Sequence, residues 1–157
     1  MLISEMSRRE CCDFLARLGF GRLACAHENH PYIVPIYFAY EFDRLYGFTT
    51  MGQKIEWMRS NPFVCVEADE IRGGVEWTSV VVRGRYEEMC DTPEQAKMRQ
   101  QMKGLLEKRP IWWQTGFAAA QTEGQFKWDI PVFYSIHIEE ITGRRASPDD
   151  PAPGYIG

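Results

Sequence analysis

One short segment carries side chains that suit a bound phosphate: Thr49-Thr50-Met51-Gly52-Gln53-Lys54. It offers two hydroxyls, a flexible glycine and one lysine where an expected strand meets an expected helix. The N–H groups at a helix N-terminus attract anions, and lysine adds a charge-assisted hydrogen bond. The segment therefore predicts a phosphate site. An alternative stays open, because threonine and glycine also cap helices and Lys54 also suits a solvated surface.

A second segment, Val34-Pro35-Ile36-Tyr37, places a proline inside an apolar, β-branched run. Proline cannot donate a ladder hydrogen bond, so the strand is expected at a sheet edge or at a bulge. A bulge leaves neighbouring backbone N–H and C=O groups free for a planar polar ligand. An ordinary barrel corner explains the proline equally well.

The histidines do not form a recognised metal motif. His27 and His30 are three residues apart with Glu28 between them, whereas the zincin motif needs histidines four apart on a helix. We expect a solvated turn here and no metal site. Neither the cysteines nor the paired carboxylates identify a catalytic group.

Length and composition predict a single folded domain. The chain has 157 residues, 45% of them apolar, and a formal net charge of −4. This apolar content excludes disorder, and the negative charge disfavours nucleic-acid binding through bulk positive charge. No apolar run reaches the roughly 20 residues that span a bilayer. We therefore expect neither a nucleic-acid nor a membrane partner.

The five cysteines form an odd set without a Cys-x-x-Cys pair. A disulfide framework or structural zinc site is therefore not expected. The first ten residues carry charges where the apolar core of a signal peptide would lie. These features predict a cytoplasmic protein with reduced thiols.

The periodicity of the chain predicts mainly strands. A first helix should begin at the capping pattern of Ser7 and Glu10 and end before Gly19. Further helices are expected over 53–60 and from Pro93 to Pro110. The expected strands are Gly21–Ala26, Pro31–Tyr40, Leu45–Thr49, Phe63–Ala68, Trp77–Met89 with a bulge or bend at Gly84, and Val132–Ile141.

These elements predict a mainly β protein: a barrel of about six strands with peripheral helices. The first three strands look like a meander. We expect one domain over residues 1–145 and a loose tail over 146–157, where Ser, Pro, Asp and Gly dominate.

The two segments introduced above, in this order and spacing, resemble the pyridoxamine 5′-phosphate oxidase-like family of FMN-binding split barrels. Further matching pieces follow along the chain, and the similarity covers most of residues 15–145. The small members that include nitroimidazole-resistance proteins are the most similar branch. The segments that carry the resemblance are Leu23-Ala24, 31–38, 45–54, 61–65, 77–84 and 141–144.

The resemblance implies a six-stranded split barrel that forms a homodimer, with FMN bound in two grooves between the subunits. By position, the flavin ring would lie along Val34, Pro35, Ile36 and Tyr37, and Ser79 would place a polar side chain near it. Thr49 and Lys54 would hold the phosphate, with Thr50 and Gln53 beside them.

Two departures limit the resemblance. Family members often have Arg-Lys where this chain has Gln53-Lys54, so one cation is lost from the phosphate site, and Arg83 is a candidate to replace it. The C-terminal segment with arginine and histidine that true pyridoxamine phosphate oxidases use to hold substrate is also missing from this sequence. Vitamin B6 oxidation is therefore not expected.

Two functions of different classes remain. The first is an FMN-dependent oxidoreductase acting on a small molecule, in which the flavin supplies the hydride and electron chemistry. The second is a non-catalytic flavin- or haem-binding protein for storage, sensing or transfer. Haem ranks below FMN, because the three histidines lie in no recognisable haem context.

The aromatic stretch from Ile111 to Trp128 has no clean period of 2 or 3.6 residues. Full exposure of two adjacent tryptophans, Trp112 and Trp113, would forfeit the free energy of burying them, so a free loop is not expected here. The stretch is expected either to plug one end of the barrel or to cover the substrate side of the flavin as a lid, and we favour the lid.

Overall fold

Eight strands and three helices make up the part of the chain that the computed structural model describes, residues 1–108 and 132–148. In chain order they are β1 (Leu2–Glu5), α1 (Arg8–Leu18), β2 (Phe20–His27), β3 (His30–Tyr37), β4 (Ala39–Glu41), β5 (Arg44–Thr49), α2 (Gln53–Ser60), β6 (Phe63–Arg72), β7 (Glu76–Glu88), α3 (Pro93–Glu107) and β8 (Val132–Ser147). The expected mainly β class is confirmed, with more strands than the six expected.

All eight strands belong to one antiparallel sheet in the order β3-β2-β6-β7-β8-β5-β4, with β1 added on β8. Strands β3 and β4 lie at opposite ends of this order, yet the single residue Phe38 joins them along the chain. Both edges of the sheet must therefore meet at Phe38, and the sheet has to curl round to achieve this. The result is a split barrel.

The expected strand over Pro31–Tyr40 is thus two strands, and the expected meander is wrong. Phe38 is fully buried, and its backbone N–H donates to the carbonyl oxygen of Gly19 at 3.0 Å instead of joining a ladder. The chain changes edge at this point. A periodicity of two continues through the break, so the sequence pattern does not reveal it.

Helix α1 begins and ends as the sequence predicts. The Ser7 hydroxyl accepts the backbone N–H of Glu10, and the Glu10 carboxylate accepts the backbone N–H of Ser7 at 2.7 Å, which completes the capping box. Gly19 ends the helix in the left-handed conformation, with φ of 59°. Its apolar side, including Cys11, Phe14 and Leu15, faces the sheet.

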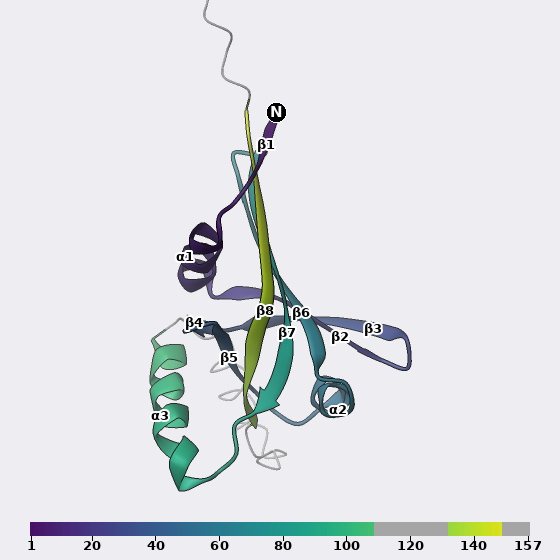
Figure 1. The fold of residues 1–157 in the computed structure, drawn as a ribbon, viewed down its shortest axis with the longest axis vertical. Coiled ribbons are helices and arrows are strands. Elements are labelled where there is room, and N and C mark those ends of the chain that lie inside the picture. The colour runs from purple at the N-terminus through teal and green to yellow at the C-terminus, as the bar shows by residue number, and fades with distance from the viewer. Residues whose placement is uncertain (109–131, 149–157) are drawn as a thin grey trace, which may run out of the picture.

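Strands β6, β7, β8 and β1 extend beyond the barrel as a long arm beside α1 (Figure 1). Strand β8 continues to Ser147, past the expected end at Ile141, and Ala146 is buried within it. The residues expected to start the loose tail therefore pair with Leu2 and Ile3 of β1, a strand that the sequence did not predict. Residues 149–157 lie outside the described part.

The register of β7 against β8 shifts between Arg83 and Gly84, which confirms the expected bulge. A Cβ at Gly84 would overlap the carbonyl oxygen of His137, so the close strand approach requires glycine. The barrel is filled by the inward residues of its strands together with α1 and α2. The most deeply buried are Leu15, Leu23, Phe38, Leu45, Ile55, Met58, Val66, Val80, Val82, Tyr134 and Ile136.

Candidate functional site

The predicted phosphate segment spans the turn between β5 and α2. Thr49 ends β5, and Gly52 is the N-cap residue of α2. Because glycine has no side chain, no side-chain oxygen of the N-cap residue accepts the first N–H groups of this helix. The Thr49 hydroxyl donates to the carbonyl oxygen of Thr50 at 3.3 Å. Thr49 and Thr50 are half-buried, whereas Gln53 is exposed. The turn thus places two hydroxyls beside the positive end of a helix dipole.

Lys54 lies in the first turn of α2, half-buried against the Cys25 thiol of β2. Burial lowers the pKa of its ammonium, while Cys25 acts in the opposite direction. None of the ion pairs among the described residues involves Lys54. A desolvated cation without a counter-ion is costly, and a bound anion would remove that cost. The donor set therefore fits a phosphate-bearing ligand.

The Val34–Tyr37 segment lies on β3, which pairs with β2 alone among the described strands. The predicted edge position of Pro35 is thus confirmed. Val34 and Ile36 point to the core, opposite Leu23 and Gly21.

Pro35 and Tyr37 point away from the core, and the Tyr37 ring packs on Phe20 with centroids 5.0 Å apart. The segment therefore presents side chains to both faces of the sheet.

Ser79 does not lie with Lys54. It belongs to the outer face, by which we mean the side of β3, β2, β6 and β7 opposite the core. Four residues that pair with one another across these strands lie on this face: Pro35, Arg22, Glu67 and Val81. The Ser79 hydroxyl donates to the Glu67 carboxylate at 2.9 Å. Because Lys54 lies by the buried Cys25, one ligand on a single chain cannot readily contact both Lys54 and Ser79.

The outer face carries further polar groups that the sequence did not single out. A hollow of about 450 Å³ is lined by Ser79 together with Trp77, Thr142 and Arg144. Arg144 lies in register with Ser79 across β7 and β8. Only the strand register, which no local motif encodes, brings these side chains together.

Arg83, the suggested replacement cation, also lies on the outer face. Its guanidinium pairs with Glu140 at 3.4 Å beside the β-bulge. It therefore does not supply the missing charge to Lys54 within one chain.

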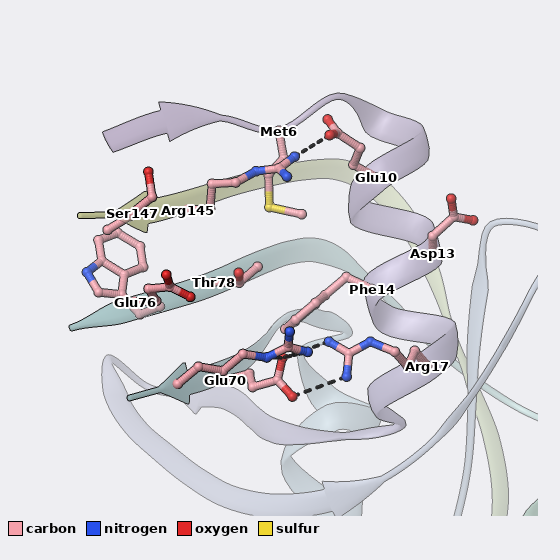
Figure 2. A pocket seen from close by; sticks show the side chains of 13 residues that line it. Met6, Glu10, Asp13, Phe14, Arg17, Glu70, Glu76, Thr78, Arg145 and Ser147 are labelled. Carbon is pink, nitrogen blue, oxygen red and sulfur yellow. Dashed lines mark hydrogen bonds and ion pairs between the residues drawn. The ribbon is translucent and has the colours of Figure 1, made fainter. Parts of the chain in front are cut away.

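A separate hollow of about 460 Å³ lies between α1 and the arm (Figure 2). Arg17 pairs with Glu70 at 2.8 Å, and Arg145 pairs with Glu10. Arg72 also pairs with Glu70, at 2.9 Å. Each of these arginines thus has an acidic partner within the chain, with Arg17 and Arg72 sharing Glu70, and none of the predicted site residues lines this hollow.

The two histidines of the predicted turn, His27 and His30, each lie within hydrogen-bond distance of a different oxygen atom. His27 Nδ1 lies 3.0 Å from the Ser60 hydroxyl, and His30 Nδ1 lies 3.0 Å from the carbonyl oxygen of Glu28. Within residues 1–108 and 132–148, no three metal-ligating side chains gather. The aromatic stretch Ile111 to Trp128, predicted as lid or plug, lies outside the described residues.

The sequence and the fold of this chain match a known family of proteins. The family model described as pyridoxamine 5′-phosphate oxidase matches residues 7–145, so the chain belongs to that family. An uncharacterised protein of Rhizobium meliloti (strain 1021) is 40% identical over 146 residues, which cover 93% of this chain and 97% of that protein.

Solved structures agree with this assignment. A protein from Mesorhizobium loti, described as FAD-binding, is 41% identical with a TM-score of 0.79, covering 94% of this chain and 99% of that one. A protein from Bacteroides thetaiotaomicron, described as a putative 5-nitroimidazole antibiotic resistance protein, is 16% identical with a TM-score of 0.64. That match covers 92% of this chain and 89% of that one, and at this identity it shows the fold alone.

Proposed function

We propose that this chain binds the FMN unit of a flavin at the turn between β5 and α2. The carrying observation is Lys54, a half-buried ammonium without an acidic partner among the described residues. The phosphate would receive the Lys54 charge, the hydroxyls of Thr49 and Thr50, and the first N–H groups of α2. The family and the Mesorhizobium loti relative support a flavin as the ligand.

The edge strand β3 would receive the flavin ring. Its Val34–Tyr37 segment has a neighbouring strand on one side only among the described residues. Backbone groups on an unpaired side suit the polar edge of a flat ring, and Val34 and Ile36 anchor the strand to the core. The ligand is FMN itself or FAD, which contains the same unit.

The separation of Ser79 from Lys54 supports a homodimer with shared sites. If both residues contact one flavin, they must come from different copies of the chain. The outer face suits such contact, because Ile33 and Phe63 are 62% and 61% exposed on it. Large apolar side chains exposed on the same face are the residues that a second copy of the chain could cover.

We further propose that the protein is an oxidoreductase acting on a small molecule. A bound flavin supplies hydride and electron transfer, and the protein binds, orients and shields it. The five cysteines are free thiols, which supports a cytoplasmic setting. Within the described residues, no helix is long and apolar enough to cross a membrane.

The test begins with the absorption spectrum of the purified protein and the mass of any released chromophore. Titration with FMN and riboflavin then compares the wild type with Lys54→Ala. Losing a charge-assisted hydrogen bond should weaken FMN binding about ten- to hundredfold and riboflavin binding little. Equal losses for both ligands would place the phosphate elsewhere, and absence of any flavin binding would refute the proposal. Turnover with a reduced nicotinamide and an acceptor separates an enzyme from a carrier.

A further inference from the structure

One arginine of the outer face stands apart from the others by its lack of an acidic partner. Every arginine that the structure describes, except Arg144, pairs with a carboxylate at 4.0 Å or less. The next residue along β8, Arg145, lies on the opposite face and pairs with Glu10 (Figure 2). We infer that Arg144 is an anion-binding residue, and that the hollow it lines binds a flat molecule with a single carboxylate.

The strand register brings the polar groups of this hollow together. Ser79 of β7 lies opposite Arg144 of β8, and Trp77 and Thr142 are the next residues on the same face, so all four line the hollow of about 450 Å³. The Ser79 hydroxyl donates to Glu67, whereas the Thr142 hydroxyl has no hydrogen-bond partner within residues 1–108 and 132–148. A hollow of this volume is large enough for a small ligand.

The side chains around the hollow select the chemistry of that ligand. A guanidinium presents a planar fork of N–H donors, which matches the two oxygens of a carboxylate. The unpaired hydroxyl of Thr142 can donate to the same group. The half-buried indole of Trp77 offers a flat apolar wall against which a ring can stack. A flat carboxylic acid uses all three features.

Glu5 limits the charge that the ligand can carry. It lies opposite Arg144 in the register of β1 and β8 and lines the same hollow, yet the two side chains form no ion pair in the described part of the chain. Its carboxylate would repel a second negative charge on the ligand, so a monoanion fits better than a phosphate dianion. Glu5 also competes with the ligand for the Arg144 guanidinium.

The hollow also bears on the substrate of the proposed oxidoreductase, and this consequence rests on the proposed function. In the proposed homodimer, Ser79 lies near the flavin bound by the other copy of the chain. A carboxylate held by Arg144 would then lie beside that flavin. The small molecule that the flavin oxidises or reduces would therefore be a flat carboxylic acid.

The experiment compares benzoate with its neutral isostere benzamide, using NMR titrations of the full chain at fixed ionic strength. The wild type should bind benzoate about tenfold more tightly, which is the usual effect of one charge-assisted hydrogen bond. Arg144→Gln should abolish this preference, and Glu5→Gln should increase it because the competing carboxylate is gone. Arg145→Gln is the matched control on the opposite face and should keep the preference.

Each outcome decides between the hollow and the flavin site. Equal binding of benzoate and benzamide by the wild type overturns the inference and leaves the flavin site untouched. A preference that survives Arg144→Gln also overturns it, because the carboxylate would then bind elsewhere. If the wild type shows no preference and light scattering finds that Arg144→Gln dissociates a dimer, Arg144 pairs with a carboxylate of the second copy instead. A benzoate preference that depends on Arg144 in a protein that binds no flavin supports the hollow and refutes the proposed function alone.

Discussion

The ring of Tyr134 lies directly against the backbone of Gly47. The two residues are paired across β5 and β8, and Tyr134 is 1% exposed. A Cβ on Gly47 would lie 2.5 Å from the Tyr134 hydroxyl oxygen. Burial raises the pKa of that hydroxyl well above its ordinary value. This contact fixes the strand that delivers Thr49 to the candidate phosphate site.

We therefore predict that Gly47→Ala destabilises the protein. Overpacking of this kind costs about 1–3 kcal/mol of unfolding free energy, measured by urea denaturation. The matched control is Gly104→Ala in α3, where a Cβ would meet nothing within 4 Å. Alanine in a helix should raise the unfolding free energy there by about 0.5–1 kcal/mol. Similar effects of both substitutions would contradict the close Gly47–Tyr134 contact.

A second prediction concerns the cost of keeping Lys54 half-buried. Lys54→Met removes the desolvated ammonium and keeps its apolar stem, so the ligand-free protein should become more stable by about 0.5–2 kcal/mol. The same variant should lose its preference for phosphate-bearing flavins over riboflavin.

The pH dependence of this effect has a definite sign. The pKa of Lys54 is lower in the folded protein than in the unfolded chain. The unfolded chain then binds more protons between the two pKa values, and stability rises with pH in that window. The gain from Lys54→Met should therefore shrink as the pH approaches and passes 10.5. A gain independent of pH would show that desolvated charge is not its cause.

A third prediction concerns acid stability. The Glu10 carboxylate accepts from the backbone N–H of Ser7 and from the Ser7 hydroxyl, and it pairs with Arg145, which together lower its pKa to about 2. Because the folded pKa lies below the unfolded one, this stabilisation is present above about pH 4.5 and is lost as the pH falls towards 2.

Urea midpoints at pH 7, 4.5 and 3 test this prediction. Glu10→Gln should lower the midpoint at pH 7 and flatten its decline between pH 4.5 and 3. The control is Glu94→Gln, an exposed carboxylate in the first turn of α3. A Glu10→Gln profile parallel to that of the wild type would count against the capping carboxylate as the acid-sensitive group.

A fourth prediction concerns the proposed dimer. Ile33→Glu and Phe63→Glu place charges on the outer face, and light scattering should show a monomer that has lost flavin affinity. Phe42, in the turn between β4 and β5, is 87% exposed and provides the control Phe42→Ser. A dimer that survives both glutamate substitutions, or one that Phe42→Ser dissociates, would move the interface elsewhere.

Local patterns predicted the parts of the fold that depend on neighbouring residues. The capping box of Ser7, the stop at Gly19 and the bulge at Gly84 each follow from chemistry within a few positions, and the structure confirms them. The family resemblance is confirmed as well, since it depended on an ordered set of short segments.

Features that depend on pairing between segments far apart in the chain could not be predicted from the sequence. Strand β1 forms only because β8 continues to Ser147 and offers it an edge. The break at Phe38 depends on a backbone N–H that donates to the carbonyl oxygen of Gly19, a residue far back along the chain at the end of α1. Likewise, the family resemblance assigns both Ser79 and Lys54 to the flavin, and only the strand register shows that Ser79 lies on the face of the sheet away from Lys54.

The single-residue link at Phe38 also has a kinetic consequence. The two strands it joins cannot both reach their places until the five strands between them in the sheet order have assembled. Closure of the ring is thus a late event that depends on contacts remote in sequence, and proteins dominated by such contacts fold in roughly milliseconds to seconds. A nascent chain emerging from the ribosome would have to wait for β8, its last described strand, before the barrel could close.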